Sequence, residues 1–136
     1  MQGITKNDLI IRIGGEGGEG VISVGDFITQ ACARAGLDVY TFKTFPAEIK
    51  GGYAMYQVRA STERVYNQGD IFDVLCAFNG DAYNNNRAFL KPGTAIVYDS
   101  PSDFTPDIPP GVHAYPIPMT QTAKEMNNPR AKNMVA

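Results

Sequence analysis

The chain has 136 residues, of which 43% are hydrophobic and 19% are charged, so it suits one ordinary domain and is not a disordered chain. Its formal net charge of −2, without a clustered basic face, argues against a nucleic-acid binder. Because no apolar run approaches the ~20 residues of a membrane span and the polar start lacks the centre of a signal peptide, we expect a cytoplasmic protein with no membrane partner.

The first third of the chain predicts a βαβ unit. Residues 9–13 are mostly apolar, as in a buried strand of a parallel sheet, and a glycine-rich turn follows them. Apolar residues then recur at helical spacing over residues 21–35, and Gly36 is placed to end the helix. Residues 38–42 are β-branched and aromatic, which predicts the second strand of the unit.

The remaining elements follow in the same alternating style. Residues 53–61 alternate between two unlike faces, which predicts a strand at a sheet edge or an interface, with Arg59 in an interface salt bridge. Asp81 is placed to cap a helix that runs to Leu90. We expect three further strands: one in the second part of the segment 71–78, one over residues 94–98 and one over residues 113–117.

Together these elements predict a three-layer α/β fold, with a mostly parallel Rossmann-like sheet and helices on both faces. We take residues 1–136 as one domain. Pro129, after two asparagines, is typical of the start of a helix, so we expect the chain to be a piece of a longer polypeptide, truncated at its C-terminal helix.

The cysteines do not predict a metal site. Cys32 and Cys76 lie far apart inside apolar segments, without CxxC or His/Cys spacing. Two cysteines and His113 are too few ligands for a structural zinc or an iron–sulfur cluster. We expect buried free thiols and no metal bound by this chain.

The turn at residues 15–20 matches GxGxxG between a predicted strand and helix, through Gly15, Gly17, Gly18 and Gly20. Two features weaken a dinucleotide site: Glu16 and Glu19 add negative charge, and residues 42–44 lack the acidic residue that grips a ribose. Three interpretations stay open. The turn binds NAD or FAD, allows close packing of helix on strand, or faces a partner subunit or a cofactor held elsewhere.

A second glycine-rich loop, residues 45–52, follows the second strand of the βαβ unit. The carboxyl ends of such strands line the ligand crevice, so both loops should emerge at one edge of the sheet. Lys50 beside Gly51 and Gly52 is suited to a carboxylate or phosphate, with Glu48 to pair with it or anchor the loop. A solvated Lys–Glu pair explains the same residues.

Five segments carry a family resemblance, and they occur in the family's order over nearly the whole chain. They are GGEGGEGV (14–21), FPAEIKGG (45–52), QVRAS (57–61), LKPGTAIVYDS (90–100) and AKNMVA (131–136). In these segments the chain resembles the gamma domain of 2-oxoacid:ferredoxin oxidoreductases. The second segment is most similar to gamma domains fused to the thiamine pyrimidine-binding subunit, as in 2-oxoglutarate-type enzymes.

The resemblance implies a part of an enzyme that is inactive when isolated. Such enzymes decarboxylate a 2-oxoacid on thiamine diphosphate with magnesium, pass electrons through iron–sulfur clusters to ferredoxin, and transfer the acyl group to coenzyme A. The gamma domain holds none of these cofactors alone. It packs on the thiamine-binding domains and is implicated in gating the thiamine site and coenzyme A access.

The resemblance also implies which residues face the active site: Glu48, Lys50, Gly51 and Gly52, with Lys50 as the charge partner of the oxoacid carboxylate. The chain departs from the commonest family pattern at Glu19, where Gln is usual, which argues against direct phosphate contact by the first loop. The alternative is a free-standing nucleotide-binding protein of Rossmann type.

Overall fold

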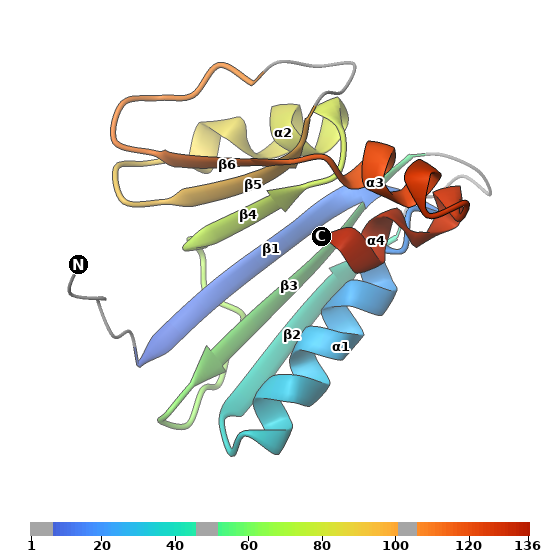
Figure 1. Cartoon of the computed structure of the whole chain (residues 1–136). Helices are drawn as coiled ribbons and strands as arrows, with labels where there is room; N and C mark the ends of the chain where they lie inside the picture. The colour runs from blue at the N-terminus through green and yellow to red at the C-terminus, as the bar shows by residue number, and fades with distance from the viewer. Residues whose placement is uncertain (1–6, 46–51, 101–105) are drawn as a thin grey trace, which may run out of the picture.

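The computed structural model describes residues 7–45, 52–100 and 106–136. In that part of the chain, six strands form one sheet in the order β2-β3-β1-β4-β5-β6 (Figure 1). The strands are β1 (Asp8–Glu16), β2 (Asp38–Thr44), β3 (Tyr53–Ser61), β4 (Val74–Ala77), β5 (Ala95–Asp99) and β6 (His113–Ile117). The helices are α1 (Val21–Arg34), α2 (Gly80–Asn86), α3 (Met119–Glu125) and α4 (Lys132–Val135), with 3₁₀ turns η1 (Arg87–Phe89) and η2 (Pro129–Ala131).

The predicted α/β fold is confirmed. Strands β1, β4, β5 and β6 are parallel, and β3 is antiparallel to both of its neighbours, β1 and β2. Strand β2 therefore runs in the same direction as β1, which leaves β3 as the one reversed strand in a mostly parallel sheet. The predicted unit β1-α1-β2 exists, but β3 lies between its two strands.

Of the two interpretations of β3, the edge strand was wrong, because β1 and β2 pair with it on either side. Both of its faces are also covered. Tyr56 and Val58 are each 1% exposed beneath α1, and Gln57 on the other face is also 1% exposed. The segment after β3 covers that second face, where the Gln57 amide donates to the carbonyls of Gln68 and Gly69. Arg59 bonds Asp8 at 2.7 Å within the chain, and its predicted role at an interface stays a prediction.

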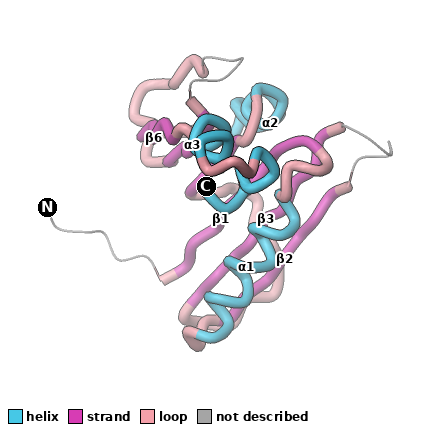
Figure 2. Tube along the Cα trace, turned by 45° about the vertical axis from the view of Figure 1, so that its right-hand side comes forward, coloured by secondary structure: helices cyan, strands magenta, loops and turns pink. Residues whose placement is uncertain are grey.

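Two apolar clusters hold helices to the sheet. On one face, α1 and α3 pack on Ile13, Tyr56 and Phe78; on the other, α2 packs on Leu75 and Ile96. Figure 2 shows the two helical layers on either side of the sheet. The three-layer prediction is therefore confirmed. Tyr56 is part of the core between α1 and the sheet.

The helix ends correct two predictions. Asn79 rather than Asp81 caps α2, because its side-chain oxygen accepts from the Ala82 N–H at 2.9 Å while Asp81 lies in the first turn. The predicted helix to Leu90 ends at Asn86 and continues as a 3₁₀ turn. Gly36 ends α1 as predicted, with a φ of 85°.

Helix α3 was not predicted. Its first turn is bonded by Asp99, which accepts from the Thr120 N–H at 3.1 Å. Because this capping residue lies at the end of β5, 21 positions before Thr120, no local sequence pattern marks the start of the helix. Every helix in the described part of the chain is too short or too polar to span a lipid bilayer.

Candidate functional site

The glycine turn packs the start of α1 tightly against the sheet. A Cβ at Gly15 would overlap Val21 and press on Phe78, so only glycine allows this approach. Gly20 adopts a left-handed φ of 84°, and the side chain of Asn133 fills the space beside it. This geometry supports the close-packing interpretation of the turn.

Glu19 is the anchor of the turn. One carboxylate oxygen accepts from the backbone N–H of Glu16 at 2.7 Å and from the side-chain amide of Asn79 at 2.6 Å. The other oxygen bonds the ammonium of Lys132 at 3.0 Å. The carboxylate thus joins the turn to the start of α2 and to α4, and it is occupied by internal partners rather than by a ligand.

Lys132 also reaches the ends of two parallel strands. Its ammonium donates to the Phe78 carbonyl at 2.6 Å and lies 3.2 Å from the Asp99 carboxylate. Burial favours a higher pKa for Asp99, but hydrogen bonds from Thr120 and Lys132 outweigh it, and the pKa is lowered. Asp99 is therefore a charged, internally bonded group and not an open crevice residue.

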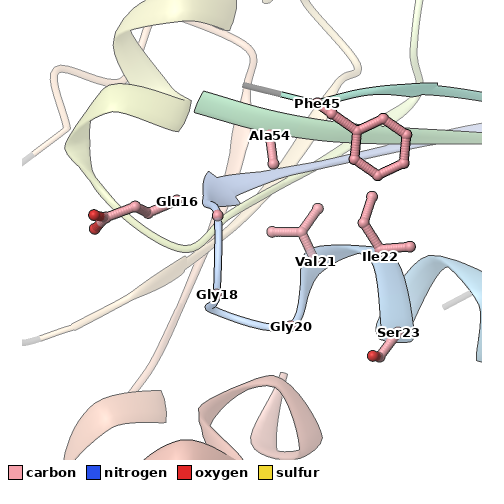
Figure 3. A pocket seen from close by; sticks show the side chains of 9 residues that line it. Glu16, Gly18, Gly20, Val21, Ile22, Ser23, Phe45 and Ala54 are labelled. Atoms are coloured by element: carbon pink, nitrogen blue, oxygen red, sulfur yellow. The ribbon is translucent and has the colours of Figure 1, made fainter. Parts of the chain in front are cut away.

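A pocket of about 280 Å³ lies beside the turn (Figure 3). Its apolar wall is formed by Phe45 after β2, Ala54 of β3, and Val21 and Ile22 of α1. Glu16 borders it but points away from the apolar side chains. No basic side chain lines this pocket in the described part of the chain, so it is suited to an apolar group better than to a phosphate.

The start of α1 borders the same pocket. Within the described residues, no side chain caps this helix and no acidic residue lies in its first turn. Neither glutamate of the turn caps α1: Glu16 is exposed, and Glu19 bonds the Glu16 N–H.

The two predicted loops meet at one edge of the sheet. The Gly17 N–H donates to the Gly52 carbonyl at 3.1 Å, so the first turn contacts the end of the second loop. Glu48, Lys50 and Gly51 lie outside the described residues, so their predicted roles stay predictions.

The cysteines are free and half-buried in the described structure. Burial raises the pKa of Cys76 to about 12, which keeps its thiol protonated and unreactive. Cys32 lies on α1 and Cys76 on β4, on separate elements, and no group of three His, Cys, Asp or Glu residues suited to a metal occurs among the described residues.

Sequence reasoning missed Lys132 and Asn79, which complete this arrangement. A carboxylate that is largely buried between a glycine turn and a sheet edge is usually paired with a cation. Glu19 in the turn was therefore the sequence signal for a nearby basic residue. What the sequence lacks is the partner's identity, because Lys132 lies 113 positions further along the chain.

Residues 10–136 match the sequence profile of the family described as pyruvate ferredoxin/flavodoxin oxidoreductase. The chain belongs to this family. The resemblance drawn from the five sequence segments is therefore confirmed, and the chain corresponds to the gamma part of 2-oxoacid:ferredoxin oxidoreductases.

Two solved structures of the family share its fold. A 2-oxoglutarate:ferredoxin oxidoreductase from Magnetococcus marinus, with 2-oxoglutarate, coenzyme A and succinyl-CoA bound, is 73% identical, with a TM-score of 0.92 over 96% of this chain and 23% of that one. A keto/oxoacid ferredoxin oxidoreductase gamma subunit from Geobacter sulfurreducens is 26% identical, with a TM-score of 0.79 over 96% of this chain and 73% of that one.

A further relative is the ketoisovalerate oxidoreductase subunit VorA of Methanothermobacter marburgensis. It is 31% identical over 125 residues, which are 90% of this chain and 26% of VorA. The chain thus spans about a quarter of VorA and of the Magnetococcus oxidoreductase.

Proposed function

We propose that this chain is the gamma domain of a 2-oxoglutarate:ferredoxin oxidoreductase, part of a longer polypeptide with the thiamine pyrimidine-binding domain. The observation that carries the proposal is the 73% identity and TM-score of 0.92 to the Magnetococcus enzyme. The relative's bound 2-oxoglutarate and coenzyme A support these as the substrates here.

The domain's role would be to close and gate the thiamine site and to control access of coenzyme A. Three features support this. The two glycine-rich loops meet through Gly17 and Gly52, the pocket beside them has an apolar wall, and Lys50 brings a positive charge to the second loop. Glu48, Lys50, Gly51 and Gly52 would face the active site.

The chain itself does not fit the redox cofactors. An iron–sulfur cluster needs about four thiolates, while this chain has two cysteines on separate elements, and the Cys76 thiol stays protonated. Thiamine diphosphate, magnesium and the clusters would therefore be held by partner domains, with ferredoxin as the electron partner of the whole enzyme. The free-standing nucleotide binder is the weaker candidate, because no basic side chain lines the pocket beside the glycine turn among the described residues.

The test is Lys50→Ala in the complete enzyme. If Lys50 pairs with the oxoacid carboxylate, the KM for 2-oxoglutarate should rise about 10- to 100-fold, the cost of one hydrogen bond between charged groups. The matched control is Lys91→Ala, an exposed lysine before β5 at the opposite end of the parallel strands. If the KM values for 2-oxoglutarate and coenzyme A were unchanged in Lys50→Ala, the gating role would be refuted and the domain would be a scaffold only.

A further inference from the structure

One ammonium group joins four segments at the carboxyl edge of the sheet. Lys132 of α4 bonds Glu19 in the glycine turn, the Phe78 carbonyl after β4 and Asp99 at the end of β5. An ammonium has three N–H donors, and these three partners use all of them. Each of the three N–H donors of Lys132 therefore has a partner within the chain.

These contacts differ from an ordinary surface ion pair. The side chains of Lys132 and Glu19 are 16% and 21% exposed, and that of Asp99 is 3% exposed. The pair between Lys43 and Asp26, with 33% and 44% exposure, is the kind that contributes little. A shielded lysine between two carboxylates is screened much less by salt and holds its geometry more firmly.

The contacts of Lys132 extend to the pocket through the turn. Glu19 accepts from the Glu16 N–H, and the next residue, Gly17, donates to the Gly52 carbonyl. Glu16, Gly17 and Gly18 line the pocket. Among the described residues no side chain caps α1, whereas Glu19 bonds the turn and is itself held by Lys132 and Asn79.

We propose that Lys132 is a positioning residue for the acyl-acceptor step: through Glu19 it fixes the glycine turn that forms the wall of the pocket and meets Gly52. This inference rests on the proposed function of that site. Lys132 itself touches no substrate. Loss of its charge would loosen the turn and weaken the use of coenzyme A, while the decarboxylation half-reaction would change less.

The experiment uses the complete enzyme with Lys132→Met, Lys132→Arg and, as a matched control, Lys124→Met. Lys124 is an exposed lysine of the neighbouring helix α3. Amide hydrogen exchange at Glu16 and Gly17 reports the turn directly. The KM for coenzyme A and the rate of 2-oxoglutarate-dependent reduction of an electron acceptor without coenzyme A report the two half-reactions.

We expect exchange at Glu16 and Gly17 to become about tenfold faster in Lys132→Met, with a several-fold higher KM for coenzyme A and partial rescue by Lys132→Arg. Exchange equal to that of Lys124→Met would overturn the inference. Faster exchange with unchanged KM would support the positioning of the turn and overturn the proposed function of the pocket instead, so the two failures are distinct.

If Lys132→Met does not assemble, Lys132→Gln replaces it, since its amide keeps N–H donors for the Phe78 carbonyl without the charge. The same direction of change, smaller in size, is expected. Exchange at Glu16 and Gly17 equal to the parent enzyme in Lys132→Gln would refute the role of the charge.

Discussion

Gly25 of α1 packs directly against the ring of Tyr56 in the sheet. Gly25 lies in the middle of α1, where alanine would normally favour the helix by about 1 kcal/mol. A Cβ at Gly25, however, would overlap the ring of Tyr56, which is 1% exposed. The Tyr56 hydroxyl is also fixed, because it donates to Asp26 at 2.8 Å, so the ring has little freedom to move away.

We therefore predict that Gly25→Ala lowers the free energy of unfolding by roughly 1–3 kcal/mol, because overpacking outweighs helix propensity. Urea unfolding of the variant measures the change. Gln30→Ala, an exposed substitution in the same helix, should stay within about 0.5 kcal/mol of the parent. Stabilisation by Gly25→Ala would mean that α1 moves off Tyr56 at low cost.

At the scale of elements, the sequence predicts what local patterns determine. Helix α1 and its end at Gly36, the strands around the core, and the turn-to-helix start at residue 129 all follow from residues within a few positions. The insertion of β3 between β1 and β2 does not, because pairing depends on contacts such as Ile11 with Val58, 47 positions apart in the chain. The unlike faces of β3 were read correctly, but the chain itself covers both of them.

Helix α2 offers a test of how one residue joins two elements. Asn79 caps α2 with its oxygen and donates its amide to Glu19. Aspartate is about as good a cap as asparagine, but it has no amide donor and would place a second carboxylate against Glu19.

We predict that Asn79→Asp destabilises the protein by about 1–3 kcal/mol although the cap of α2 is kept, because the bond to Glu19 is lost and like charges meet. Thermal unfolding at neutral pH measures this. The double variant Asn79→Asp/Glu19→Gln restores a donor opposite the new carboxylate and should recover part of the loss. A neutral Asn79→Asp would show that capping is the whole role of this residue.

For the whole molecule, the fold class and the family could be predicted from the sequence. The alternation of strands and helices indicates the first, and five segments in the family's order indicate the second. The candidate site followed only in part: the meeting of the two loops was predicted, while Lys132 was not, because its partners come from three distant segments. The network at the sheet edge is a property of the assembled fold, and so is its response to acid.

Among the described residues, three carboxylates have folded-state pKa values below the usual range. A hydrogen bond from Arg59 lowers the pKa of Asp8, bonds from Tyr56 and Lys43 lower that of Asp26, and Asp99 is lowered despite its burial. A lowered folded pKa adds stability above the unfolded pKa of about 3.9, and that stability is lost as pH falls through the folded value.

We therefore predict that the stability contributed by these carboxylates is constant between pH 7 and about pH 5 and declines steeply below about pH 4. The measurement is the urea midpoint of the purified chain at several pH values. Asp99→Asn, which cannot gain that proton, should begin less stable and lose less on acidification. An equal acid slope in Asp99→Asn and the parent would contradict this role for Asp99, and the acid response would then arise from the more exposed Asp8 and Asp26.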